Sequence, residues 1–80
     1  MINSIIVKAE WDEVAKVWVA QSDDVPGLAA QSPSIELLRP KVLDMISDLI
    51  ELNKMDVQLS EIPVHIVTHS FDKLPVVQAA

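Results

Sequence analysis

Residues 34–53 read SIELLRPKVLDMISDLIELN, and this stretch decides the fold. Its apolar residues recur at alternating steps of three and four, the pattern of a helix that lays one face on a core. The stripe comprises Ile35, Leu38, Val42, Met45, Leu49 and Leu52, widened by Leu43, Ile46 and Ile50. We predict a core-facing helix here, capped by Ser32 or Ser34.

Pro40 lies inside this helical pattern. Proline has no backbone N–H and crowds the carbonyl of Glu36, at a cost of about 3 kcal/mol in a helix interior. We expect a kink at Pro40 or a helix that restarts there. Asn53 and Lys54 predict the end, because asparagine tolerates the left-handed conformation and lysine suits the negative end of the helix dipole.

Three carboxylates follow one another along the side of this helix that faces away from the apolar stripe. Asp44, Asp48 and Glu51 stand at i, i+4 and i+7, which places them in one exposed column. Charged helix faces commonly just contact water. The functional interpretation is a docking stripe for a basic protein.

Short β patterns lie on both sides of the helix. Residues 5–11 alternate with a period of two and carry apolar side chains on both faces, and residues 16–21 form a similar run that resembles a central strand. The two runs predict a hairpin. Residues 28–31 supply a short third strand after Pro26 and Gly27, where a fixed φ followed by a positive φ predicts a type II turn.

After the helix, residues 62–68 alternate as a fourth strand, and Pro63 favours an edge position or a strand start. The sequence thus predicts an α+β fold in the order β-β-β-α-β, an antiparallel three-stranded meander plus a further strand, with the helix packed on one face of the sheet. One helix covers only one face, so the other must meet solvent or a partner. Residues 1–70 form the predicted domain, and residues 71–80 a C-terminal tail that a partner orders.

Twelve acidic and six basic residues give the 80-residue chain a formal charge of −6. This charge repels phosphate backbones and anionic lipids, so we expect neither direct nucleic-acid binding nor membrane binding, and it favours a basic partner. The N-terminal apolar run stops at Lys8 and Glu10, too soon for a signal peptide or a membrane span. We expect a cytoplasmic protein.

Groups that could carry catalysis are few. His65 and His69 are four strand residues apart, about 13 Å, which is too far to share a metal ion. The carboxylates Glu10, Asp12 and Glu13, together with Asp23 and Asp24, leave a metal-dependent nuclease as a minor alternative. Cysteine is absent, and the single glycine excludes the usual phosphate-binding loops. We therefore predict no enzyme, no cofactor and no catalytic or metal-binding residue.

Two tryptophans stand in the predicted hairpin. Trp11 and Trp18 are large enough to anchor a core or an interface. We expect them on opposite sides of the hairpin, with one facing the helix and the other the uncovered face of the sheet. The second would be a contact in a dimer.

In order and spacing, several segments resemble the HicB-like antitoxin domains, in particular a small, uncharacterised bacterial subfamily that consists of this domain alone. These segments are the hairpin SIIVKAEWDEVAKVWVAQS, the turn DDVPGL, the serine-capped helix ending in ELN and the strand PVHIV, over roughly residues 3–69. The resemblance implies a partial ribonuclease-H-like fold without catalytic carboxylates, and a tendency to dimerise. It also implies neutralisation of HicA, a small basic toxin that cleaves messenger RNA. Residues 70–80 are too short for the DNA-binding domain that many HicB proteins carry.

The preferred hypothesis is a noncatalytic protein-binding module that blocks a basic HicA-like toxin by steric occlusion. Its predicted partner-binding residues are Asp44, Asp48, Glu51 and Trp18. The alternative is a stand-alone homo-oligomer, a dimer or larger, that buries the uncovered sheet face against itself and has no toxin partner.

Overall fold

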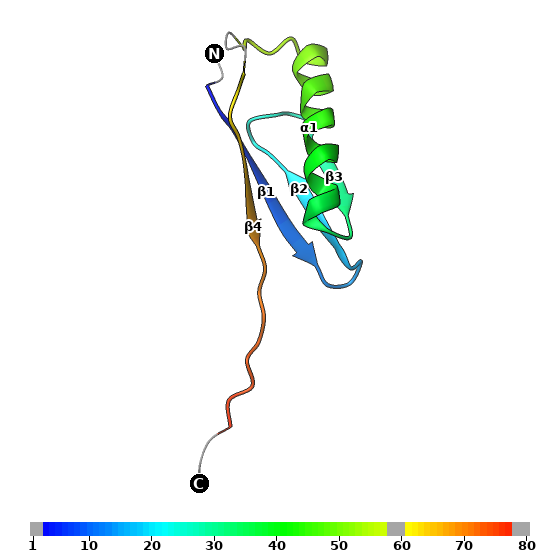
Figure 1. The fold of residues 1–80 in the computed structure, drawn as a ribbon, viewed down its shortest axis with the longest axis vertical. Coiled ribbons are helices and arrows are strands. Elements are labelled where there is room, and N and C mark those ends of the chain that lie inside the picture. The colour runs from blue at the N-terminus through cyan, green and yellow to red at the C-terminus, as the bar shows by residue number, and fades with distance from the viewer. Residues whose placement is uncertain (1–2, 58–60, 78–80) are drawn as a thin grey trace.

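The computed structural model describes residues 3–57 and 61–77, and these form four strands and one helix (Figure 1). The elements are β1 (Ile5–Asp12), β2 (Val17–Gln21), β3 (Ala29–Ser32), α1 (Ile35–Leu52) and β4 (Val64–His69). The predicted order β-β-β-α-β and the α+β class are confirmed.

The strands form one mixed sheet in the order β3-β2-β1-β4. The first three pair antiparallel as the predicted meander, with β2 in the middle of it. β4 adds parallel to β1 at the other edge, where the Ile5 N–H donates to the Pro63 carbonyl oxygen at 2.9 Å. Pro63 directly precedes an edge strand, which is where a residue without an N–H is tolerated.

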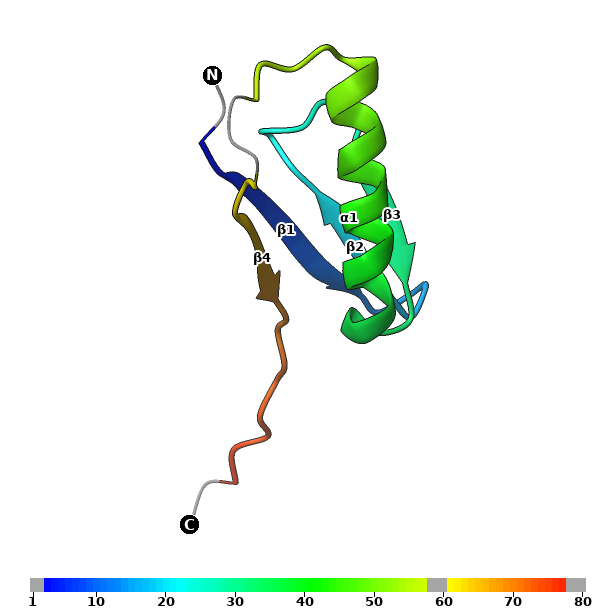
Figure 2. The ribbon, with the colours of Figure 1, turned by 45° about the horizontal axis from the view of Figure 1, so that its top comes forward.

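The helix packs over β2 and β3 and leaves the β4 side of the same face less covered (Figure 2). Its row Leu38, Val42 and Ile46 is buried against the inward residues of the sheet. Burial contributes about 1.5–3 kcal/mol for each such side chain. The core comprises these three with Ile5, Val7, Ala9, Ala20, Val25, Leu28 and Ala30.

The predicted helix stripe was wrong at its margins. Leu52 and Leu43 are 75% and 49% exposed, whereas Ile46, which was expected only to widen the stripe, is buried. The reason is the position of the helix axis over β2 and β3, which centres the buried face on an i, i+4 row through Val42. Ile35, Met45, Leu49 and Ile50 are half-buried at the sides of that row.

The helix begins as predicted at Ser34, whose Oγ accepts a hydrogen bond from the Leu37 N–H. It continues through Pro40 as one element, so the predicted restart at Pro40 was wrong. Buried side chains on both sides of Pro40, Leu38 and Val42, hold the two turns on the same sheet.

The end of the helix differs from the prediction in one residue. Lys54, with φ 50°, takes the left-handed conformation, whereas Asn53 stays right-handed at φ −85°. The Met55 N–H donates to the Ile50 carbonyl oxygen and the Lys54 N–H to that of Glu51, which is the Schellman pattern. The Asn53 side chain binds a distant turn of the chain, where its Nδ2 donates to the Pro26 carbonyl oxygen at 3.0 Å.

Beyond β4 the chain continues away from the sheet as an extended arm, residues 70–77 (Figure 1). The molecule measures 63 × 23 × 19 Å, and its radius of gyration of 16.3 Å exceeds the roughly 12 Å of a compact chain of this length. The predicted tail therefore begins just after His69, and its last residues, 78–80, lie outside the described part. Within the described residues, no helix has both the length and the apolar character needed to cross a bilayer.

Candidate functional site

The side of the sheet that faces away from α1 is here called the open face, because α1 packs on the other side. The register places alternate residues of every strand on it. These are Ile6, Lys8, Glu10, Asp12, Val17, Val19, Gln21, Ala29, Gln31, His65, Val67 and His69. The open face is mixed in character, with apolar side chains between charged and polar ones.

A shallow hollow lies on the open face where β1 and β4 run side by side. It has a volume of about 320 Å³ and is lined by Ile6, Lys8, Glu10, Val67 and His69. Ile6 and Val67 leave 47% and 52% of their surface exposed on these adjacent strands. A pair of exposed aliphatic side chains bordered by an ammonium and a carboxylate suits contact with another protein.

The predicted acidic stripe, Asp44, Asp48 and Glu51, is exposed along the outer side of α1. In the described part of the chain the ion pair that forms is Lys16 with Glu13, so these three carboxylates have no cationic partner there. Asp48 and Glu51 border a hollow that also contains Leu52 and Lys54. The structure brings the three predicted acidic residues together on one surface.

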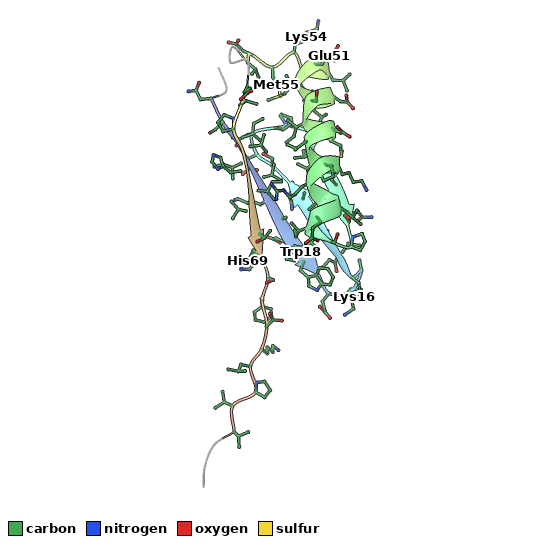
Figure 3. The ribbon with its side chains drawn as sticks, viewed as in Figure 1. Lys16, Trp18, Glu51, Lys54, Met55 and His69 are labelled. Carbon is green, nitrogen blue, oxygen red and sulfur yellow. The ribbon has the colours of Figure 1, made fainter. Side chains whose placement is uncertain are left out.

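Trp18 is not part of that surface. It lies directly opposite Trp11 in the hairpin register, and the two rings meet edge to face at 5.5 Å with an interplanar angle of 60°. Opposed residues share a face, so the expectation that the tryptophans lie on opposite sides was wrong. Trp18 is half-buried against the core on the helix side, at the opposite end of the sheet from Glu51 (Figure 3).

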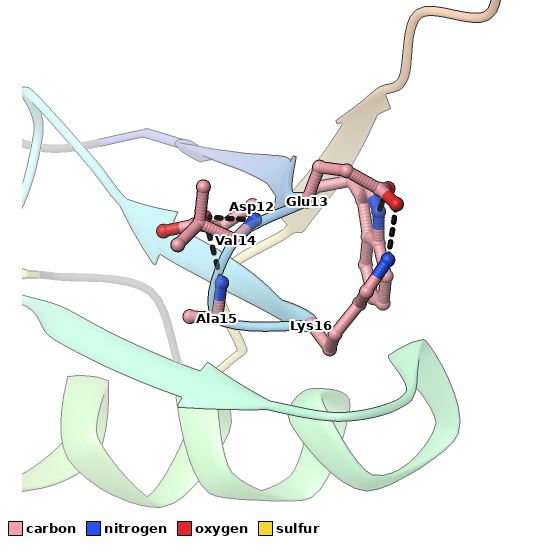
Figure 4. A network of polar contacts seen from close by, with 6 residues as sticks. Asp12, Glu13, Val14, Ala15 and Lys16 are labelled. Atoms are coloured by element: carbon pink, nitrogen blue, oxygen red, sulfur yellow. Dashed lines mark hydrogen bonds and ion pairs between the residues drawn. The ribbon is translucent and has the colours of Figure 1, made fainter.

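The acidic residues near the hairpin are used for local structure. Asp12 Oδ1 accepts hydrogen bonds from the N–H groups of Val14 and Ala15, at 3.0 and 3.1 Å, and so shapes the turn (Figure 4). Glu13 binds the Trp11 indole N–H and the Lys16 ammonium. The Lys16 ammonium, with the help of the Trp11 N–H, lowers the pKa of Glu13 below its ordinary value.

The sequence left a metal-dependent site among the carboxylates Glu10, Asp12, Glu13, Asp23 and Asp24 as a minor alternative, and it predicted that His65 and His69 are too far apart to share an ion. Among the residues that the structure describes, no three His, Asp or Glu side chains gather closely enough to hold a metal ion. His65 and His69 both lie on the open face of β4, as Cα partners of Ile6 and Glu10.

The segment 22–28, SDDVPGL, connects three distant parts of the chain. Ser22 Oγ donates to the Ile6 carbonyl oxygen at 2.6 Å, and Asp24 Oδ2 accepts from the Ile6 N–H at 2.8 Å. These bonds continue the β1 ladder past Gln21, the last β2 residue paired with it. Gly27 completes the turn with φ +88°. A Cβ placed on Gly27 would lie 3.4 Å from Cδ2 of Leu49. The segment is therefore a structural junction and was not identified as one from the sequence.

Sequence reasoning also missed two surfaces. The Ile6 and Val67 pair follows from the parallel pairing of β4 with β1, which period-two patterns do not reveal. The arm carries four exposed apolar residues, Phe71, Leu74, Val76 and Val77. Their lack of regular spacing had suggested only a tail.

Comparison with known proteins adds a family but no activity. The family described as a domain of unknown function (DUF1902) matches residues 4–79. The chain belongs to this family. A similar solved structure is that of the hypothetical protein TTHA1013 from the extremely thermophilic bacterium Thermus thermophilus, at 38% sequence identity and a TM-score of 0.70. The similarity covers 91% of this chain and 99% of that protein. No curated protein matches the chain.

Proposed function

We propose that this DUF1902 domain is a noncatalytic, HicB-like protein-binding module of the cytoplasm that neutralises a small basic toxin by covering its active surface. The observation that carries the proposal is the acidic stripe on α1. Asp44 and Asp48 are like charges at i, i+4, an arrangement that destabilises a helix by about 0.2–0.5 kcal/mol. Glu51 lies in the last turn, which contains no basic residue, and so opposes the helix dipole.

The stripe is thus electrostatically unfavourable for the domain alone. A basic surface docked along α1 would supply the missing cations and convert repulsion into attraction. The overall charge of −6 would also accelerate the encounter, with a dependence on ionic strength. Occlusion requires no catalytic group on this chain, in keeping with the mechanism implied by the HicB resemblance.

The test compares two double charge reversals in the full chain. Asp44→Lys with Asp48→Lys reverses two of the three charges of the stripe, and Asp56→Lys with Glu61→Lys makes the same change of net charge at exposed residues elsewhere. Calorimetry would measure binding to a purified small basic HicA-like protein. We expect the stripe variant to raise Kd about tenfold or more, equivalent to about 1.4 kcal/mol, and to flatten the salt dependence of Kd.

The thermal stability of the same variants distinguishes a loss of binding from a loss of folding. Reversing Asp44 and Asp48 exchanges one i, i+4 repulsion for another, between two lysines, and places cations toward the helix C-terminus, so thermal stability should be unchanged or higher. Weaker binding by a more stable variant would support a docking role. Equal effects of the two double reversals on Kd, or binding unaffected by either, would refute the role of the stripe.

A second candidate function, a homo-oligomer without a toxin, is favoured by the exposed Ile6 and Val67 pair on the open face. Two copies packed through this hollow would bury it. The expected result is a dimer in light scattering that Val67→Asp dissociates, and a monomer that persists at high concentration would argue against it.

A further inference from the structure

The two edges of the sheet differ in how they are protected. At the β3 edge the strand is only four residues long, and Lys41 of α1 donates from Nζ to the Gln31 carbonyl oxygen at 2.9 Å. At the β4 edge, six residues pair with β1 on one side, and in the described part of the chain nothing pairs with the other side. Exposed strand edges readily accept another strand. The β4 edge is the one that is open to such addition.

The arm, residues 70–77, continues directly from this strand in an extended form (Figure 1). Its apolar side chains, Phe71, Leu74, Val76 and Val77, are between 73% and 93% exposed. Phe71 borders a hollow with Trp11 and His69 on its own copy, yet most of its surface stays in water. The chain thus contains both parts of a strand-addition interface. The arm is the segment to be added, and the β4 edge is the site that accepts it.

The arm cannot reach the β4 edge of its own chain without reversing direction, and it follows β4 with no turn (Figure 1). A second copy removes this difficulty. A two-fold axis beside Ser70, perpendicular to the sheet, would run the two β4–arm segments antiparallel. Each arm would then lie along the β4 edge of the other copy, so that one contact is formed twice.

Charge and shape favour the second copy as the occupant. Residues 64–77 contain Asp72 and Lys73 as their only formally charged residues, so this segment is neutral within a chain of charge −6. A two-fold axis perpendicular to the sheet keeps opposed residues on one face, so Asp72 falls opposite Thr68 of the other copy and Leu74 opposite Ile66. Thr68 borders a groove of about 230 Å³ between α1 and β4, lined also by Ile35, Arg39, Val64 and Ile66. A leucine side chain in this groove would contact aliphatic side chains and the aliphatic stem of Arg39.

We propose that two copies of this chain exchange their arms, each adding residues 71–76 as a fifth strand to the β4 edge of the other, with Leu74 in the groove beside α1. Pro75 then lies near the end of the added strand, where its missing N–H can face outward. This inference is independent of the proposed toxin binding. It uses the edge of the sheet and leaves both the acidic stripe and the open face uncovered.

Sedimentation equilibrium of full-length variants tests the proposal. We expect the unchanged chain to be a dimer at micromolar concentration and Leu74→Asp to raise the dimer dissociation constant at least tenfold. Two matched aspartate variants should leave it unchanged, Val14→Asp at the exposed hairpin turn and Val67→Asp on the open face. Circular dichroism should be the same for all, because Leu74 lies outside the core.

Crosslinking fixes the register, and the absence of native cysteine makes it simple. A mixture of Thr68→Cys and Asp72→Cys chains should form an intermolecular disulfide under mild oxidation, whereas Thr68→Cys mixed with Val14→Cys should not. A monomeric unchanged chain would overturn the proposal. So would a dimer that Val67→Asp dissociates and Leu74→Asp does not, which would place the second copy on the open face. Toxin binding would be unaffected by either result.

Discussion

The two ends of this molecule are held together in different ways. At the end where α1 finishes, hydrogen bonds join residues 16 to 27 positions apart, from Ser22 and Asp24 to Ile6 and from Asn53 to Pro26. At the hairpin end, the side-chain hydrogen bonds join residues two or three positions apart, and the exposed arm leaves the sheet nearby. The first end fixes the tertiary fold, while the second shapes only a turn.

This difference separates folding residues from surfaces available for recognition. The segments SDDVPGL and ELN, which carried much of the resemblance to HicB-like domains, meet at the first end through Pro26 and Asn53. They mark the fold, and their presence says little about a ligand. The surfaces that remain for partners are the acidic stripe, the open face and the β4 edge with its arm.

The largest expected effect comes from shortening one leucine in each region. Leu38→Ala removes a fully buried side chain from the core and should lower the free energy of unfolding by about 2–5 kcal/mol. Leu74→Ala, in the arm, removes the same atoms from a side chain that is 85% exposed. It should change the free energy of unfolding by less than about 0.5 kcal/mol. Urea denaturation at a concentration where the chain is monomeric measures both. Similar losses for the two variants would show that the arm packs on its own domain.

The junction end should also be sensitive to a single methyl group on Gly27. Gly27→Ala places a Cβ on a residue with φ +88°, 3.4 Å from Leu49, and should destabilise the domain by about 1–2 kcal/mol in the same assay. Gly27→Asn is the matched control, since asparagine carries the same Cβ but tolerates positive φ better. A smaller loss for asparagine assigns the effect to the backbone conformation. Equal losses would assign it to the Leu49 contact, and no loss for either would contradict the junction's tight packing.

The order of elements could be predicted because it depends on local patterns. The helix cap at Ser34, the positive φ at Gly27 and the edge position after Pro63 follow from the chemistry of single residues. Register and helix position depend on contacts between distant residues, and there the predictions were wrong: Trp11 and Trp18 share a face, and Leu52 is exposed. For the candidate site, the acidic column followed from helical periodicity. The Ile6 and Val67 pair did not, because it requires β4 to lie parallel beside β1.

The smallest expected effect is a pH dependence at the hairpin, and it tests how local that region is. Lys16 is the main cause of the lowered pKa of Glu13, so Lys16→Gln should raise that pKa toward the ordinary value of 4.5, with the Trp11 N–H retaining part of the lowering. A lowered carboxyl pKa stabilises the fold above the unfolded-state pKa, and this contribution is lost as the pH falls through the folded-state value. Because Glu13 is fully exposed, added salt should reduce the shift. NMR titration of the Glu13 carboxyl carbon at low and high salt measures it, and Leu74→Ala serves as the control. A Glu13 titration that Lys16→Gln leaves unchanged, or that Leu74→Ala moves, would mean that groups outside the turn hold this carboxylate and that the hairpin end is less local than its hydrogen bonds indicate.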